Sequence, residues 1–308
     1  MRDVELVAIT DRSGLDESCH HGRVVATDAA GAVVTRIGDI DAPIYPRSSN
    51  KPMQADAMIR AGWEPSAEQL ALACASHDGT ERHVDVVRST LDASGLTPDD
   101  LSNTADLPLD RASAHAVLAA GGAAVPLLMN CSGKHAGMIA TCRVNGWPVE
   151  GYLDQDHPLQ QAITRRITEL VGEVVHIGVD GCGAPAHVMS LTDLAGAFRT
   201  LAAERGAVWA AMTEHPELVG GDGRDVTRLM RAVPDLMSKD GAEGVFAAAL
   251  PDGRAAAVKI ADGNKRAAGV VLAAALSTVD VDVDPGDFGP PILGHGRPVG
   301  RVRPTFGA

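Results

Sequence analysis

The chain has 308 residues, of which 45% are hydrophobic, so it is long enough to bury a substantial core. Its 27 lysines and arginines face 40 aspartates and glutamates, and the formal charge of −13 opposes long-range attraction to nucleic acids or anionic membrane surfaces. We therefore expect a compact globular protein whose partners are neither nucleic acids nor membranes.

The N-terminus and the cysteine content bear on the cellular compartment. No run of about 18 apolar residues is present, and residues 1–6 carry acids where a secretory signal would have a basic region and an apolar core. The five cysteines are an odd number, which fits free thiols or metal ligands better than a disulfide framework. The sequence thus predicts a cytoplasmic protein in a reducing compartment.

Short runs rich in β-forming residues lie near both ends of the chain. Residues 4–10, 23–28 and 32–37 predict an antiparallel meander with a hairpin turn at 28–31. Residues 244–250 and 254–261 repeat the pattern around a Pro-Asp-Gly turn.

Between these ends the sequence is rich in alanine and leucine at helical spacing. Helices are predicted over 51–61, 82–93, 158–171, 191–204 and 207–215, with another from Lys265 to about Leu276. The residues after 280 lack a helical period, and we expect them to wrap the surface or to reach a neighbouring subunit.

This order of elements predicts an α+β fold. Strands from the N- and C-terminal regions form one antiparallel sheet, and a largely helical middle covers its faces. We expect a single domain over 1–308, with the sheet region at about 1–45 and 240–280 and the helical region at about 46–239.

A serine and a lysine with catalytic potential lie at Ser48 and Lys51. Pro52 belongs near the start of a helix, so Ser48 is expected at a helix N-terminus with Lys51 on the same face. A neutral lysine there would accept the serine proton in acyl transfer. The S-x-x-K pattern also arises by chance, and a capping serine beside a solvated lysine is the alternative.

Two further candidates for the same chemistry are Ser76 and Lys259. Ser76 follows the apolar run 70–75 and either caps the next turn or supplies a second hydroxyl. Lys259 lies in an alternating apolar strand, where burying an amine is costly unless it has a task. A strand-borne lysine facing a helix-borne serine is therefore plausible.

Cys131 and Cys182 stand among glycines and small residues, in Asn-Cys-Ser-Gly-Lys-His and Asp-Gly-Cys-Gly. A tetrahedral zinc site needs two further ligands, for which His135, Lys134 and Asp180 are the candidates. Two buried reduced thiols without a metal are the alternative. The segment 241–245 is either a tight turn or a loop that contacts substrate.

Taken together, these motifs resemble the Rhizobium-type L-asparaginases, a family distinct from the threonine-nucleophile and plant-type enzymes. The resemblance extends over most of the chain and is carried by residues 17–22, 46–52, 74–77, 130–138, 156–158, 180–183, 239–245 and 259–263. It implies a fold similar to serine β-lactamases, penicillin-binding proteins and related glutaminases, and it implies a homodimer.

The resemblance also implies residue roles. It implies two serine–lysine tandems, which fall on Ser48 with Lys51 and on Ser76 with Lys259. It implies a zinc ion at residues that match Cys131, Lys134 and Cys182. We expect this zinc to tune substrate affinity.

The hypothesis from the sequence is an L-asparaginase that hydrolyses the side-chain amide of L-asparagine to L-aspartate and ammonia. Arg47 and Asp180 suit the two charges of a zwitterionic amino acid, and with His135 they are the predicted substrate-binding residues. Two alternatives remain: another serine–lysine amidohydrolase, such as a glutaminase or β-lactamase-like enzyme, or a non-catalytic protein that binds an amino acid or zinc.

Overall fold

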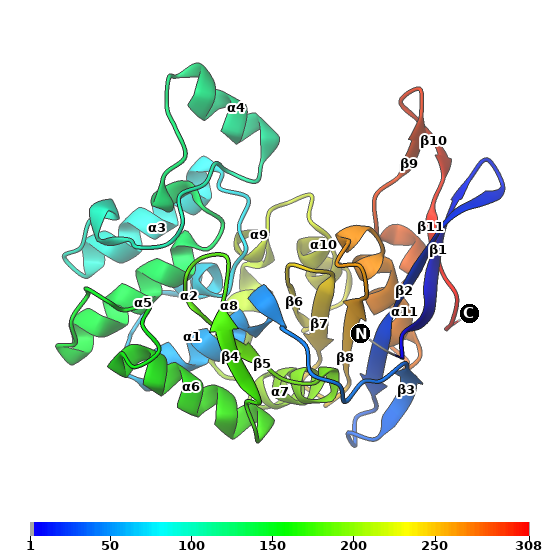
Figure 1. The fold of residues 1–308 in the computed structure, drawn as a ribbon, viewed down its shortest axis with the longest axis horizontal. Coiled ribbons are helices and arrows are strands. Elements are labelled where there is room, and N and C mark those ends of the chain that lie inside the picture. Colours follow the sequence, from blue (N-terminus) through cyan, green and yellow to red (C-terminus); the bar gives the residue numbers. More distant parts are fainter. Residues whose placement is uncertain (1–2, 308) are drawn as a thin grey trace. The chain divides into compact units, whose positions relative to one another are not determined.

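The computed structural model describes residues 3–307 (Figure 1). The chain divides into two compact units. The sheet unit comprises Met1–Ser49, Val188–Arg205 and Arg228–Ala308. The helical unit comprises Asn50–His187 and Gly206–Thr227.

The sheet unit is built on an antiparallel sheet with the strand order β11-β1-β2-β8-β7-β6, in which β3 pairs with β2 beside this path. The central pair joins the two ends of the chain, because Gly22 of β2 lies opposite Ile260 of β8. The strands are β1 (Glu5–Arg12), β2 (Leu15–Thr27), β3 (Val33–Ile37), β6 (Met237–Asp240), β7 (Val245–Ala249), β8 (Ala255–Ile260) and β11 (Val302–Pro304).

Every residue of β7 and of β8 is buried, and successive strand residues point to opposite faces. Both faces of this part of the sheet are therefore covered. Helices α7 (Leu191–Ala203) and α11 (Ala268–Ser277) both contact β7 and β8. The predicted α+β class, with one antiparallel sheet made from both chain ends, is confirmed.

Three details of the sheet unit differ from the prediction. Strand β2 begins at Leu15, well before the predicted start, and its first residues are mostly exposed. The tail adds strand β11 to β1, with Ala8 opposite Pro304, and forms a hairpin from β9 (Ile292–Gly294) and β10 (Arg297–Gly300). Helix α7 belongs to the sheet unit because its apolar face packs on β2, β7 and β8.

The helical unit has local signals that explain several of its helix ends. Ser66 forms a capping box with Gln69 at the start of α2, and Gly146 ends α5 in the left-handed conformation. The main helices are α1 (Lys51–Arg60), α2 (Ala67–Ala73), α3 (Glu81–Ala93), α4 (Arg111–Ala119), α5 (Ser132–Asn145), α6 (Pro158–Val171), α8 (Ala207–Glu214) and α9 (Pro216–Val219).

The remaining elements are short or cross between the units. The hairpin strands β4 (His176–Val179) and β5 (Pro185–Val188) pair with each other. Helix α10 (Asp225–Ala232) starts in the helical unit and ends in the sheet unit. Short 3-10 helices are η1 (Arg47–Asn50), η2 (Pro98–Asp100), η3 (Pro126–Leu128), η4 (Lys265–Ala267) and η5 (Pro285–Asp287). Across residues 3–307 we find no helix with the length and apolar character needed to cross a membrane.

Helix α5, which the sequence did not predict, packs closely on α2. A side chain at Gly133 would place its Cβ 2.6 Å from the Leu72 carbonyl oxygen. Four residues later, a Cβ at Gly137 would lie 2.9 Å from the Trp63 ring. These glycines weaken the helical period of the sequence but allow the close approach.

Three histidines of the helical unit, His77, His135 and His187, are completely buried, and each ring lies against one hydroxyl group. The partners are Ser132 Oγ at 3.0 Å, Tyr152 Oη at 2.9 Å and Thr164 Oγ1 at 2.8 Å, respectively. Burial lowers the pKa of His135 and of His187 to about 4, and lowers the pKa of His77 well below its ordinary value. All three imidazoles are therefore neutral in the folded protein near pH 7.

These histidines should make the protein sensitive to mild acid. An unfolded histidine takes up a proton near pH 6.5, whereas folded His187 does so only near pH 4. The free energy of unfolding should therefore fall as the pH drops through this window, by roughly 1.4 kcal/mol per pH unit for each histidine. Urea unfolding between pH 7 and pH 5 measures this slope.

Replacing one of them provides the control. His187→Gln should reduce the change of the unfolding free energy with pH by the contribution of one proton, about 1.4 kcal/mol per pH unit. His115→Gln, at an exposed position of α4, should leave this pH dependence unchanged. An unchanged slope in His187→Gln would contradict the assignment of His187 as a buried neutral group.

Candidate active site

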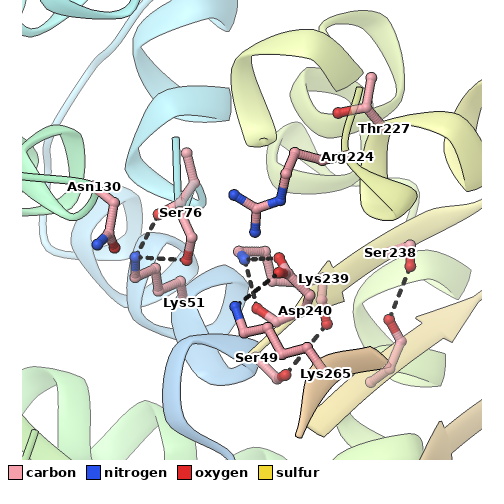
Figure 2. Close-up of polar contacts among 12 residues, drawn as sticks. Ser49, Lys51, Ser76, Asn130, Arg224, Thr227, Ser238, Lys239, Asp240 and Lys265 are labelled. Atoms are coloured by element: carbon pink, nitrogen blue, oxygen red, sulfur yellow. Dashed lines mark hydrogen bonds and ion pairs between the residues drawn. The ribbon is translucent and has the colours of Figure 1, made fainter. Parts of the chain in front are cut away.

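The ammonium group of Lys51 is the centre of a polar cluster in the helical unit. Lys51 is the first residue of α1 and is 1% exposed. Its Nζ donates to Ser76 Oγ at 3.2 Å (Figure 2). It also donates to the Ala75 carbonyl and to Cys131 Sγ at 3.1 Å. The three donors of this buried ammonium thus have acceptors from two distant segments.

Ser76 lies in the loop that follows α2. Cys74 ends that helix, and the backbone N–H of Ser76 donates to the Val219 carbonyl at 3.0 Å. Thr80, not Ser76, occupies the position before α3. Ser76 is therefore not the N-cap of α3, which begins at Glu81, and its role in the intervening turn stays a prediction.

The neighbouring His77 ties this loop to the start of α5. Its ring Nε2 lies 3.0 Å from Ser132 Oγ, and its backbone N–H donates to the Asn130 carbonyl at 3.1 Å. The ring also stacks on His83, with 5.3 Å between centroids. The sequence pattern did not mark His77 or Ser132 as site residues. The only signal was their position in the motifs at residues 74–77 and 130–135.

A cluster of sulfur and nitrogen atoms lies beside Lys51. Cys131 directly precedes α5, Lys134 and His135 lie in its first turn, and Cys182 lies in the loop between β4 and β5. Lys134 Nζ donates to Cys182 Sγ at 3.2 Å. The structure thus brings together the three residues that the resemblance assigned to zinc.

The two thiols of this cluster share a hydrogen bond, and it shifts their pKa values in opposite directions. This bond and burial raise the pKa of Cys131 well above its ordinary value. The same bond, with the charge of Lys134, lowers the pKa of Cys182 despite burial. Burial alone would lower the pKa of Lys134, but the charges of Cys182, Cys131 and Asp180 outweigh it and raise that pKa. The directions of these shifts favour a Cys182 thiolate beside a Lys134 ammonium.

The donor atoms of this cluster fit a zinc ion. The Nδ1 atom of His135 lies 2.9 Å from Tyr152 Oη, and the same ring interacts with the Cys182 thiol. Thiols and an imidazole nitrogen are donors that zinc prefers, and the Lys134 amine is an unconventional nitrogen donor. Lys134 would have to lose its proton to bind. Within the described residues 3–307, no group of three or more His, Cys, Asp or Glu side chains is arranged to hold a metal.

Asp180 lies in the same loop as Cys182, and its charge contributes to the raised pKa of Lys134. Its Oδ1 accepts the Gly181 N–H at 2.8 Å, and its backbone N–H donates to the Ala184 carbonyl at 2.9 Å. Asp180 therefore holds the tight turn that carries Cys182. The predicted substrate-binding roles of Asp180 and His135 stay predictions.

Ser48 belongs to the sheet unit and is half-buried. It lies in the 3-10 turn η1 that leads into α1, rather than within α1 itself. Arg47, just before it, has a φ of 53°, which is rare for a residue with a side chain. The chain passes from the sheet unit to the helical unit between Ser49 and Asn50.

Lys259 also belongs to the sheet unit, on strand β8. Its Nζ donates to the Glu243 carbonyl at 2.7 Å and to the Ile260 carbonyl. Burial lowers the pKa of Lys259, and the charges of Glu243 and Asp262 oppose that shift. The amine is thus held by backbone carbonyls at the end of its own strand.

Both predicted tandems are divided between the two units. Ser48 and Lys259 lie in the sheet unit, whereas Lys51 and Ser76 lie in the helical unit. The pairings of Ser48 with Lys51 and of Ser76 with Lys259 therefore stay predictions. The Lys51–Ser76 hydrogen bond, which crosses the predicted tandems, was not anticipated.

Known proteins provide an independent comparison. No curated protein matches the chain. A solved β-lactamase from Mycobacterium bovis is similar, with 15% sequence identity and a TM-score of 0.41 over 84% of this chain and 93% of that chain. The profile of the family described as L-asparaginase II matches residues 8–304, nearly the whole length. The chain belongs to the L-asparaginase II family.

Proposed function

We propose that the protein hydrolyses the side-chain amide of L-asparagine to L-aspartate and ammonia through a serine nucleophile activated by lysine. Membership of the L-asparaginase II family supports an asparaginase-type hydrolase. The observation that carries the serine–lysine mechanism is the hydrogen bond between Lys51 Nζ and Ser76 Oγ, made by a lysine that is almost wholly buried. A buried lysine beside a hydroxyl is the arrangement used for proton transfer in acyl-transfer enzymes.

In the proposed reaction, Ser48 Oγ attacks the side-chain carbonyl carbon of asparagine. The Lys51 ammonium first gives up one proton to solvent, and its neutral amine then accepts the serine proton, which passes to the leaving nitrogen as the C–N bond breaks and ammonia departs. Water hydrolyses the resulting ester and releases aspartate. The contact of Ser76 with Lys51 suits a proton relay, and Lys259 is the second lysine proposed for this chemistry.

Substitution of the two serines tests this mechanism. Ser48→Ala should lower ammonia release from L-asparagine by about 10³-fold or more, because it removes the nucleophile. Ser76→Ala should lower it less, since a relay is partly replaced by water. The measurement is ammonia production, combined with mass spectrometry of acyl-enzyme trapped during turnover.

Ser102 is exposed and supplies a matched control. Its hydrogen bond to Tyr152 is made by the backbone N–H, so the change to alanine keeps that bond. Ser102→Ala should retain full activity. An acyl group found on Ser76 would exchange the proposed roles of the two serines. Ammonia from glutamine alone would assign a glutaminase, and substrate binding without ammonia would indicate a binding protein.

We propose that a zinc ion is held by Cys131, Lys134 and Cys182 and tunes substrate affinity. The N and S donor set and the closeness of Lys134 Nζ to Cys182 Sγ support this assignment. A bound ion would supply a Lewis acid able to coordinate the substrate's carboxylate or amine. The residues themselves contribute by releasing protons from the remaining thiol and from the Lys134 ammonium.

Zinc titration of the metal-free protein tests this site directly. Binding should release protons, so the apparent affinity should rise with pH, and calorimetry in two buffers of different ionisation enthalpy measures the number released. Cys182→Ser should weaken binding by at least about tenfold. Cys19→Ser, at an exposed position, should bind as wild type does. Equal affinity in all three proteins would rule out the cluster as the site.

Arg47 and Asp180 are proposed to bind the carboxylate and the ammonium of the substrate. Because a hydrogen bond to a charged group contributes roughly 1.5–3 kcal/mol, Arg47→Ala should raise KM about 10- to 100-fold with a smaller change in kcat. Asp180→Asn should act in the same direction. Steady-state kinetics with L-asparagine measures both parameters, and an unchanged KM would remove the residue concerned from the binding site.

We further propose a homodimer located in the cytoplasm. The resemblance supports the dimer, and the five free cysteines support a reducing compartment such as the cytoplasm. Light scattering after size-exclusion chromatography measures the oligomeric state.

A further inference from the structure

We propose that the turn Gly241–Gly244, which follows strand β6, is the template that positions Ser48 and Lys259 for catalysis. Gly241 and Ser49 are then positioning residues for the nucleophilic serine. This inference rests on the proposed function and adds to it, because it assigns a role to a segment that has no catalytic group of its own. All of the contacts that carry it lie within the sheet unit.

The turn that carries Ser48 is held in a strained conformation. Arg47 has a φ of 53°, and such a conformation persists in a residue with a side chain only where neighbouring structure fixes it. The backbone N–H of Ser49 donates to the Pro46 carbonyl at 3.1 Å and closes the turn. The closed turn itself rests on the end of strand β6.

Ser49 and Gly241 make the contacts between the turn that carries Ser48 and the end of strand β6. Ser49 is fully buried, and its Oγ donates to the Lys239 carbonyl at 3.2 Å (Figure 2). A Cβ at Gly241 would lie 2.5 Å from the Pro46 carbonyl oxygen and 2.9 Å from Ser49 Oγ. Only glycine allows this approach, and the reason is steric, since Gly241 does not have a positive φ.

The end of β6 is itself fixed by an ion-paired lysine. Lys239 is fully buried, and its Nζ donates to Asp240 Oδ1 at 2.7 Å, while Lys265 Nζ lies 3.5 Å from Asp240 Oδ2 (Figure 2). The Gly241 N–H donates to the Val245 carbonyl at 2.7 Å and ties the segment to β7. A buried lysine is costly unless it is paired, so this pair indicates a rigid support.

The other side of the same turn holds Lys259. Its Nζ donates to the Glu243 carbonyl at 2.7 Å, and Glu243 has a φ of 59°. The single turn Gly241–Gly244 therefore makes both contacts. Gly241 lies against the turn that carries Ser48, and the Glu243 carbonyl accepts from the Lys259 amine. A shift of this turn would move both groups together.

Gly241→Ala tests the template. The added methyl group must displace the Pro46–Ser49 turn, so kcat for L-asparagine should fall at least about 30-fold while KM changes less than about threefold. The matched control is Gly196→Ala in α7, where a Cβ has no neighbour within 4 Å and kcat should be unchanged. Ser49→Ala, which removes only the hydrogen bond to Lys239, should lower kcat about tenfold.

A second readout separates this inference from the proposed function. The rate at which a fluorophosphonate labels Ser48, followed by peptide mass spectrometry, reports the presentation of that hydroxyl whether or not asparagine is the substrate. Labelling should slow in Gly241→Ala and in Ser49→Ala, with circular dichroism as for wild type. Wild-type labelling and kcat in the folded variants would overturn the template, and if Gly241→Ala does not fold, Ser49→Ala decides the question. A wild-type protein that releases no ammonia would overturn the function alone.

Discussion

The buried ammonium of Lys51 is the interaction on which the helical unit's chemistry depends. Removing an ammonium group from water costs several kcal/mol unless hydrogen bonds replace the lost hydration. Lys51 finds that replacement in Ala75, Ser76 and Cys131, which belong to the loop after α2 and to the start of α5. The requirement to satisfy one cation thus holds a hydroxyl and a thiol against it, although they are 25 and 80 residues away along the chain.

The elements that the sequence predicted correctly are those with local signals. The strands at both ends are short, mostly apolar runs separated by turn residues, and the helices α1, α3 and α6 have regular apolar spacing. Strand β11 was not predicted because its only reason to be a strand is pairing with β1, at the other end of the chain. Helix α5 was not predicted because its glycines serve packing on α2 and weaken the helical pattern.

The candidate site was predictable in its residue types and not in its contacts. Cys131, Lys134 and Cys182 do lie together, as the resemblance implied. The Lys51–Ser76 hydrogen bond was not predictable, because spacing along one helix says nothing about a loop that another helix brings alongside. The capping role considered for Ser76 followed from its place after the apolar run 70–75, and the structure places α3 only from Glu81, with Thr80 before it.

Glycines within the motifs explain how these polar groups are held in place. A Cβ at Gly22 would lie 2.6 Å from the Lys259 carbonyl oxygen, one at Gly133 would lie 2.6 Å from that of Leu72, and one at Gly241 would lie 2.5 Å from that of Pro46. In each case a segment that carries a candidate catalytic or metal-binding residue rests backbone against backbone. Backbone contacts have fewer degrees of freedom than side-chain packing, so the attached side chains are presented more rigidly. The glycines beside the cysteines, serines and lysines are therefore part of the site's construction, and substitutions at them should alter chemistry before they alter the fold.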